Sequence, residues 1–208
     1  MNGTSFVRPD QVVAVAEALE ADGIPYAIGG ALALGYAAEP RSTFDIDVNV
    51  FVDVSRVGDV LRCLAERLVF QFDVARARHE AERDFQVRID WNGTFIDLFF
   101  AFSAFHEGVA LRAHVYPFPG KDLPVLSPED LVCFKVMFNR PKDWVDIEKL
   151  LYFRHTDFDR EYVRQALSDA LGADDSALIR LQELMTSVHK LASEKDQMHL
   201  PHGSGTSE

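Results

Sequence analysis

Apolar residues in the first part of the chain recur at helical spacing. Over 9–22 they fall on one stripe, which predicts a helix with a proline in its first turn and a glycine after its end. A short apolar run over 24–28 then ends at Gly29-Gly30, and an Ala- and Leu-rich segment follows over 31–38. This order predicts a strand, a tight turn and a second helix.

The next segment, 44–52, alternates strictly between two kinds of residue. The even-numbered positions are all apolar, whereas Asp45 and Asp47 fall on the opposite side. Such alternation is typical of a half-buried strand. Two carboxylates therefore share one face of this predicted strand.

A further helix is predicted over 55–68, where apolar residues recur at helical spacing and Ser55 is a candidate cap. The mixed charge run over 76–84 is expected to be a solvated surface segment, with a lesser alternative in which one of its arginines contacts an acceptor.

Two strand-like segments, 85–90 and 94–100, flank the sequence Trp91-Asn92-Gly93. Because Asn-Gly between two such segments is a strong hairpin signal, we expect them to pair. Asp97 interrupts the apolar run of the second strand and is the third acid of interest.

From residue 126 the pattern becomes helical. Ser127 is a cap residue, and Pro128 with two acids opens a helix that is predicted to end near residue 138. Three more helices are predicted, over 142–154, 160–171 and 176–192. The last residues, 193–208, are expected to form a disordered tail.

The expected fold class is α+β, with an α/β core over 1–125 and a helical C-terminal region over 126–192. A chain of 208 residues is long enough for one domain and a small addition. Its 48% hydrophobic and 26% charged residues are typical of globular proteins and exclude collagen-like, disordered and coiled-coil chains.

The charge balance bears on the class of partner. The chain has 21 Lys and Arg against 33 Asp and Glu, which gives a net charge of −12. Non-specific nucleic-acid binding needs the opposite, a basic field. A polyanionic partner would therefore have to contact a local patch.

Cysteine usage and the absence of long apolar runs bear on the compartment. Cys63 and Cys133 lie far apart without partners at metal-ligand spacing, which argues against a disulfide scaffold or a zinc ribbon and favours a reducing compartment. The first residues lack the apolar core of a signal peptide, and no run approaches the roughly 18 apolar residues of a membrane span. We expect a soluble, cytoplasmic protein with no membrane partner.

The acidic positions are the strongest candidates for chemistry. At about 3.3 Å per strand residue, the Cα atoms of Asp45 and Asp47 would lie about 6.5 Å apart on one side, and their carboxylates could converge. Acids gathered on a hydrophobic sheet need neutralisation, and Mg²⁺ is the usual cation where the substrate carries phosphates. Asp45, Asp47 and Asp97 suffice to hold one or two such ions, with Mn²⁺ as an alternative.

The Gly29-Gly30 turn would supply an anion site. Without Cβ atoms the backbone can approach a phosphate closely, and the N–H groups at the start of the following helix favour negative charge. Taken alone, Gly-Gly is better explained as a tight turn, and Asp-x-Asp as a solvated strand face. Their order and spacing together favour a catalytic site.

This arrangement resembles the nucleotidyltransferase superfamily that includes DNA polymerase beta. The family pattern is a strand, Gly-Gly or Gly-Ser, a helix, a strand with Asp-x-Asp and a third acid on a later strand. IPYAIGGALALGYAAEPRSTFDIDVNV and FIDLFF supply these parts here, and LSPEDLVCFKVMFNRPKDWVDIEKLL looks like the helical segment of bacterial antibiotic-modifying and toxin-antitoxin nucleotidyltransferases. The resemblance covers about three quarters of the chain and implies a mixed-sheet nucleotidyltransferase core.

Several basic residues are candidates for binding the nucleotide. Lys135 falls in the apolar stripe of its helix, where it either snorkels past the core or points into a negatively charged site. Beside a triphosphate site the second role is favoured, and the resemblance agrees.

Two further pairs of residues are candidates with an open alternative. Arg140 and Lys142 could reach phosphates or the acceptor, or form ordinary ion pairs, and both interpretations stay open. Arg41 and Ser42 precede the acidic strand, where Arg41 could clamp a phosphate or be an ordinary surface residue.

The expected activity is Mg²⁺-dependent transfer of a nucleoside monophosphate from an NTP to an acceptor hydroxyl, with release of pyrophosphate. Asp45 and Asp47 would hold the metal, and Asp97 would complete the cluster and share in activating the hydroxyl. A small molecule or a protein fits the charge better than nucleic acid as acceptor, although a tRNA end stays open. The alternative is a non-catalytic NTP-binding or antitoxin-like partner, and the helices over 160–192 could serve a homodimer or a partner protein.

Overall fold

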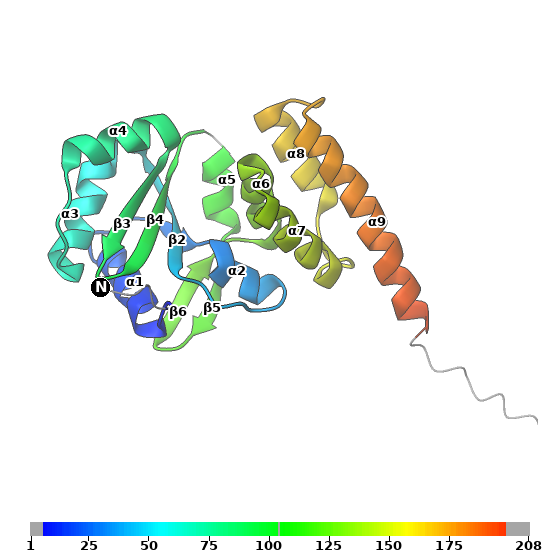
Figure 1. Ribbon diagram of the computed structural model, residues 1–208, viewed down its shortest axis with the longest axis horizontal. Helices are drawn as coiled ribbons and strands as arrows, with labels where there is room; N and C mark the ends of the chain where they lie inside the picture. The colour runs from blue at the N-terminus through cyan, green and yellow to red at the C-terminus, as the bar shows by residue number, and fades with distance from the viewer. Residues whose placement is uncertain (1–5, 104, 199–208) are drawn as a thin grey trace, which may run out of the picture. The chain divides into compact units, whose positions relative to one another are not determined.

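The computed structural model describes residues 6–103 and 105–198, which form two compact units divided after Leu131 (Figure 1). The sequence predicted this division at residue 125, shortly before the helix that contains it. The elements of the first unit, in chain order, are α1 (Pro9–Ala21), β1 (Tyr26–Ile28), α2 (Gly30–Ala37), β2 (Asp45–Asp53), η1 (Val54–Arg56), α3 (Val57–Leu68), α4 (Val74–Asp84), β3 (Gln86–Trp91), β4 (Thr94–Ala101), α5 (Phe105–Arg112), β5 (His114–Phe118), β6 (Lys121–Val125) and the start of α6 (Pro128–Phe138).

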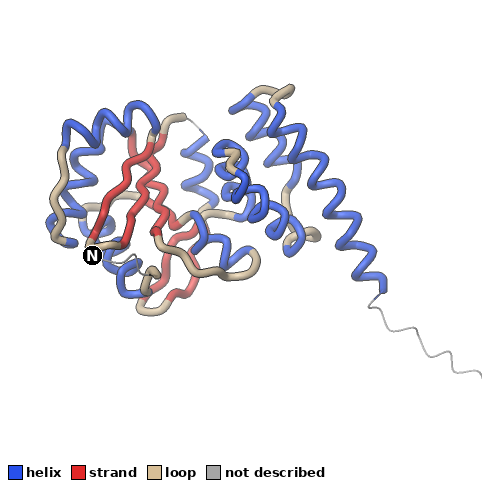
Figure 2. The backbone as a smooth tube through the Cα atoms, viewed as in Figure 1, coloured by secondary structure: helices blue, strands red, loops and turns tan. Residues whose placement is uncertain are grey.

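One six-stranded sheet organises the first unit, and its strands are red in Figure 2. The strand order is β3-β4-β2-β1-β6-β5. The β2–β4 and β1–β6 pairs are parallel, and the other neighbours are antiparallel. The sheet is therefore mixed, and the predicted α+β class is confirmed.

The central strand β2 carries the predicted alternation. Ile46, Val48 and Val50 are fully buried, whereas Asp45 and Asp47 are only half-buried. Apolar side chains on one face hold the strand in the core, because a slip of one residue would expose all of them. The acidic face is thus fixed by burial of the opposite face.

The hairpin predicted around Asn-Gly is also confirmed. β3 and β4 pair antiparallel with Trp91 opposite Thr94, which leaves a two-residue turn. Asn92 and Gly93 have φ angles of +54° and +86°, as a type I′ turn requires.

Three features of the first unit add to or differ from the expectations. The charge run is solvated, as expected, but it forms a helix, α4, which buries Ala77 and Ala81. Asp53, not Ser55, caps the turn that leads into α3, because its carboxylate accepts the Ser55 N–H. The segment between β4 and α6, for which the sequence pattern predicts no element, contains α5 and the β5–β6 hairpin.

The second unit is helical, as expected. It contains the rest of α6, then α7 (Pro141–Phe153), α8 (Arg160–Leu171) and α9 (Ser176–Met198). α9 contacts both α7 and α8 around buried side chains such as Leu150, Leu167 and Leu181. The helix continues past the predicted end at residue 192, and the remainder of the predicted tail, 199–208, lies outside the described residues.

Within the described ranges, no helix combines the length and the apolar character that crossing a bilayer requires.

Candidate metal and nucleotide site

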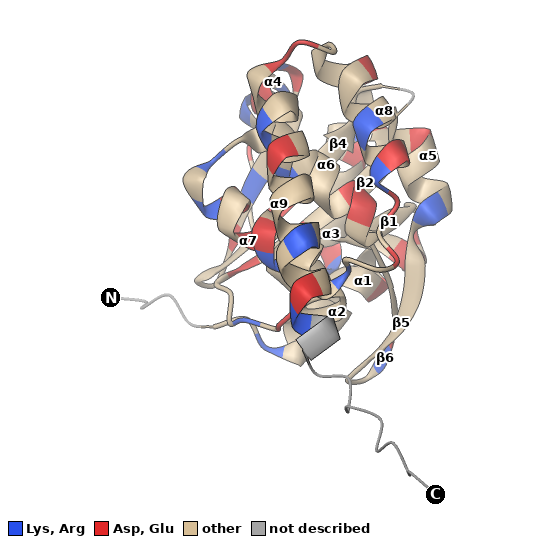
Figure 3. Ribbon diagram, turned by 90° about the vertical axis from the view of Figure 1, so that its right-hand side faces the viewer, with Lys and Arg blue, Asp and Glu red and all other residues tan. Residues whose placement is uncertain are grey.

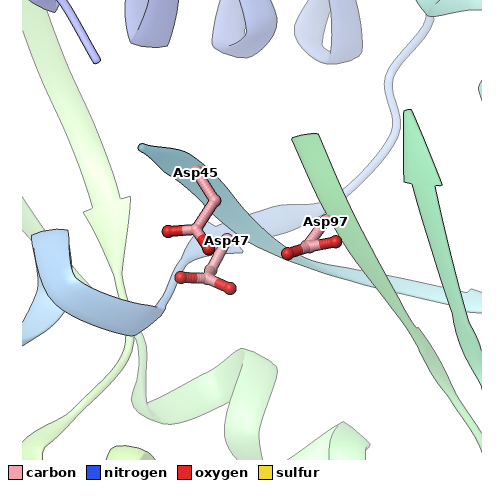
Figure 4. A group of neighbouring side chains, drawn as sticks. All are labelled: Asp45, Asp47 and Asp97. Carbon is pink, nitrogen blue, oxygen red and sulfur yellow. The ribbon is translucent and has the colours of Figure 1, made fainter. Parts of the chain in front are cut away.

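Three aspartates from two strands meet on one face of the sheet (Figure 4). Asp45 and Asp47 lie on β2, and Asp97 lies on β4, directly beside Asp47 in the parallel register. One carboxylate oxygen of each residue lies within 4.8 Å of the others. Three carboxylates at this spacing form a donor set of hard oxygen ligands, which suits Mg²⁺ or Mn²⁺.

The three acids are not equally exposed. Asp97 is buried, with 2% of its surface exposed, whereas Asp45 and Asp47 are half-buried. The Thr43 hydroxyl donates to Oδ1 of Asp45 at 2.5 Å, which orients that carboxylate.

Asp97 is held by two side chains of the neighbouring strand β3. Arg88 donates from Nε to Oδ1 at 2.8 Å and from Nη2 to Oδ2 at 2.5 Å, and Gln86 donates from Nε2 to Oδ1 at 3.1 Å. Nη2 of Arg88 also lies 3.7 Å from Oδ2 of Asp45. The hydrogen bonds to Asp97 are the main cause of a raised pKa for Arg88, so its guanidinium stays charged.

Sequence reasoning missed Arg88 and Gln86, although the hairpin contained the signal. With Trp91 opposite Thr94, counting back along both strands places Arg88 opposite Asp97. Because opposite residues of an antiparallel pair project to the same face, the turn alone predicts this contact. Arg88, Asp97 and Asp47 form one row across three strands.

The Gly29-Gly30 turn lies against the acidic strand. Gly29 caps α2 and donates its N–H to the carbonyl of Asp47 at 2.8 Å. Gly30 has a φ of +54°, and a Cβ at this position would lie 1.7 Å from Oδ2 of Asp47. The close approach of Asp47 therefore requires glycine here, whether or not a phosphate binds at the start of α2.

Arg41 and Ser42 are exposed in the loop that leads into β2, just before Thr43. They lie next to the acidic strand, as the sequence analysis expected, and their role in binding a nucleotide stays a prediction.

The remaining candidates belong to the second unit, where the structure shows what they contact. Nζ of Lys135 lies 2.7 Å from Oδ2 of Asp146 and 3.6 Å from Oδ1 of Asp143, and Lys135 is buried. Arg140 caps α7 and pairs with Asp143 at 2.7 Å, whereas Lys142 is exposed. For Arg140 the ion-pair interpretation describes what is seen, and the nucleotide roles of all three stay predictions.

Comparison with known proteins finds similarity to solved structures. No family model matches the chain, and no curated protein does. The solved structures that resemble it include those of an antibiotic-resistance factor and of a nucleotidyltransferase-like protein.

The antibiotic-resistance factor ANT(2'')-Ia in solution has a TM-score of 0.48 and 14% identity, over 93% of this chain and 98% of that one. A nucleotidyltransferase-like protein of Paracoccidioides brasiliensis has a TM-score of 0.47 and 16% identity, over 89% and 95%. ANT(2'')-Ia in complex with adenylyl-2''-tobramycin has a TM-score of 0.47 and 14% identity, over 88% and 97%. At this distance, the chemistry of the chain has to be argued from its own side chains.

Proposed function

We propose that this protein is a divalent-metal-dependent nucleotidyltransferase, which moves a nucleoside monophosphate from an NTP to a hydroxyl group and releases pyrophosphate. One observation carries the proposal. Asp45, Asp47 and Asp97 place their carboxylate oxygens within 4.8 Å of one another, and Asp47 lies against the glycine turn that begins α2. Acidic ligands for a cation and backbone N–H groups for a phosphate therefore adjoin each other.

The position of each residue suggests its role in binding the metal or the phosphates. Asp45 and Asp47 would hold Mg²⁺ or Mn²⁺, with Asp97 as the third ligand. When bound, such a metal supplies charge neutralisation for the phosphates and favours the ionised form of a bound hydroxyl. The N–H groups at the start of α2 would bind phosphate oxygens, with Arg41 and Ser42 as additional contacts.

In the reaction, the acceptor oxygen forms a bond to the α-phosphorus, and the bond from that phosphorus to the bridging oxygen breaks. Pyrophosphate leaves with the electron pair of the broken bond. The hydroxyl proton would pass to a carboxylate oxygen, and Asp97 would take part in this proton transfer. Most of the acceleration would come from positioning and from fixed charges, as in other phosphoryl-group transfers.

The class of acceptor follows from charge. With a net charge of −12, a small molecule or a protein side chain is favoured over a long polyanion. A tRNA end would need a local basic patch, for which Arg140 and Lys142 are the candidates.

A label-transfer assay tests the proposal. We expect wild-type protein with Mg²⁺ and an α-labelled NTP to move label into one fraction of a cell extract: small molecules, protein or RNA. Asp47→Asn should abolish transfer while its circular dichroism stays unchanged, because the amide removes a charged ligand.

Asp53→Asn is the matched control. It lies on the same strand, is exposed, and keeps a side-chain oxygen for the cap, so transfer should continue at the wild-type rate. Normal transfer by Asp47→Asn would contradict the proposal. Failure of the wild type to bind any NTP would favour a non-catalytic interaction protein instead.

A further inference from the structure

Arg88 hydrogen-bonds to both carboxylate oxygens of Asp97, and a cation bound by all three acids would need at least one of these oxygens. Its Nε and Nη2 donate one hydrogen bond to each oxygen of Asp97. A divalent cation takes carboxylate lone pairs at short range, so it competes with these hydrogen bonds. The cation site and the arginine therefore share a ligand.

The pairing of Arg88 with Asp97 has a clear physical cause. The side chain of Asp97 is 3% exposed, and a buried carboxylate without a partner is strongly unfavourable. Arg88 supplies the opposite charge, and Gln86 adds a neutral donor. A bound cation would satisfy the same carboxylate, so the arginine is needed most when no cation is present.

The position of Arg88 also allows its guanidinium to move away from Asp97. Its side chain is 53% exposed, and β3 is the last strand at its end of the sheet. The guanidinium lies over the ring of Phe95, with Cζ 5.1 Å from the ring centroid. Moving the charged group outward exposes no buried apolar residue of the strand, whose core contacts are made by Val87 and Ile89.

We propose that Arg88 is a displaceable counter-ion, which stabilises Asp97 in the metal-free protein and gives up at least one of its two hydrogen bonds when a divalent cation binds. This proposal rests on the proposed metal site. Arg88 is then a positioning residue, which sets the affinity for the cation without contacting the transferred group. The metal-free protein gains stability from the pair and loses cation affinity for the same reason.

The same chain contains a second pair that serves as a natural control. Arg112 donates from Nε and Nη2 to both oxygens of Asp130, which is fully buried. Within the described residues, Asp130 belongs to no group of acids that could hold an ion. Both arginines donate from Nε and Nη2 to the two oxygens of a buried aspartate, but of these two aspartates only Asp97 belongs to a group of acids that could hold an ion.

The test is a Mn²⁺ titration, in which free Mn²⁺ is followed by electron paramagnetic resonance in the wild type and three variants. We expect Arg88→Met to bind Mn²⁺ about tenfold or more tightly than the wild type. Arg88→Lys keeps the positive charge but cannot donate to both oxygens as the guanidinium does, so its affinity should rise several-fold. Arg112→Met should match the wild type.

Thermal unfolding gives a second, independent readout. Arg88→Met should melt below the wild type without Mn²⁺, and saturating Mn²⁺ should restore most of the difference, because the cation then satisfies Asp97. The loss in Arg112→Met should be the same with and without Mn²⁺. A purely structural role of Arg88 would give a loss that Mn²⁺ leaves unchanged.

The outcomes separate this proposal from the one on which it rests. If the wild type binds Mn²⁺ and neither Arg88 variant binds it more tightly, the displacement proposal is wrong and the metal site stands. If only Arg88→Met binds more tightly, a long-range charge effect explains the result, and displacement is again wrong. If the wild type and Arg88→Met both fail to bind Mn²⁺, the proposed function falls. Should Arg88→Met not fold, Arg88→Lys decides by the same criteria.

Discussion

At Gly30 the backbone turns into the left-handed region next to the carboxylate of Asp47. We expect Gly30→Ala to strain this φ of +54° and to push Asp47 away, because the new Cβ would lie 1.7 Å from Oδ2. The stability lost should be about 1–3 kcal/mol, the usual cost of such a conformation. Urea unfolding measures this loss, and the Mn²⁺ titration should show weakened binding.

Gly58→Ala is the matched control for that substitution. Gly58 is the second residue of α3, and its added Cβ would meet only Cγ1 of Val74, at an ordinary 3.6 Å. This variant should lose no stability and gain at most about 0.5 kcal/mol, because alanine is the better helix former but the position lies in the first turn. Equal stability losses in the two variants would contradict the role assigned to Gly30.

Cys63 offers a test of burial at a single residue. Burial is the main cause that raises the pKa of its thiol to about 11, and Sγ lies 2.9 Å from the carbonyl of Ala18. The thiolate is therefore scarce at pH 7.5, and we expect Cys63 to react with a disulfide reagent only after unfolding. Absorbance of the released thiol in native buffer and in guanidinium measures this, and Cys63→Ala identifies the residue. Rapid native labelling of Cys63 would contradict it.

The individual residues show what sequence reasoning can detect. Asp45, Asp47 and Asp97 stand out because a charge in a strand-like apolar run is unusual, and the structure brings their carboxylates together, while their catalytic role stays a prediction. Arg88 was missed because it lies on an edge strand, where an arginine is ordinary, and its importance comes from the residue across the hairpin. Lys135 stands out in the sequence because it falls in the apolar stripe of its helix, whereas its contacts with Asp143 and Asp146 come from a neighbouring helix.

At the level of elements, the start of α6 depends on one buried carboxylate. Asp130 accepts hydrogen bonds from Arg112 and from the Ser127 hydroxyl, and its own N–H donates to that hydroxyl. Asp130→Asn should destabilise the protein by about 3 kcal/mol, because removing one partner leaves a buried pair unbalanced. Urea unfolding is the measurement. Glu161→Gln, which breaks the exposed pair with Arg164, should have no measurable effect.

The pair between α6 and α7 makes a separate prediction. Lys135→Met leaves Asp143 and Asp146 buried without the lysine, and we expect a loss of about 3 kcal/mol. Lys149→Met, an exposed position on α7, should be neutral. Below the unfolding transition, NTP binding by Lys135→Met tests the predicted phosphate role. Unchanged NTP affinity would leave Lys135 with a structural role alone.

Helices with complete start signals were predicted most closely. Pro128–Phe138 and Arg160–Leu171 match the expected bounds, because a cap residue, a first-turn acid and an apolar stripe agree there. The β5–β6 hairpin was missed because Pro117 and Pro124 interrupt its strands and β5 exposes most of its residues. An edge strand such as β5 carries little hydrophobic alternation to detect.

For the molecule as a whole, strand order was beyond the reach of pattern reasoning. Alternation identifies a strand and its buried face, but it does not say that β2 lies between β1 and β4. That order depends on long-range packing of strands far apart in the chain. The convergence of the three acids therefore rested on resemblance until the structure gave the register.

Charge is the other property of the whole chain. Acidic and basic residues alternate along α9 in the view of Figure 3, without a continuous basic stripe on that helix. With a net charge of −12, we expect binding to a short DNA duplex at about 150 mM salt to be weaker than a Kd of about 10⁻⁴ M. Fluorescence anisotropy with a labelled duplex measures this. Tighter binding that falls steeply with salt would indicate a phosphate-binding patch and would reopen tRNA as the acceptor.

The parallel pairing of β2 with β4 also bears on when the site can exist during folding. Asp45 and Asp47 are separated from Asp97 by η1, two α-helices and a strand, so no local segment brings the three together. Closing a connection of this length precedes the contacts that compensate for its entropy. A nascent chain that has not yet paired β4 carries two of the acids but not the donor set. Cation binding by all three carboxylates would thus report that β4 has paired with β2.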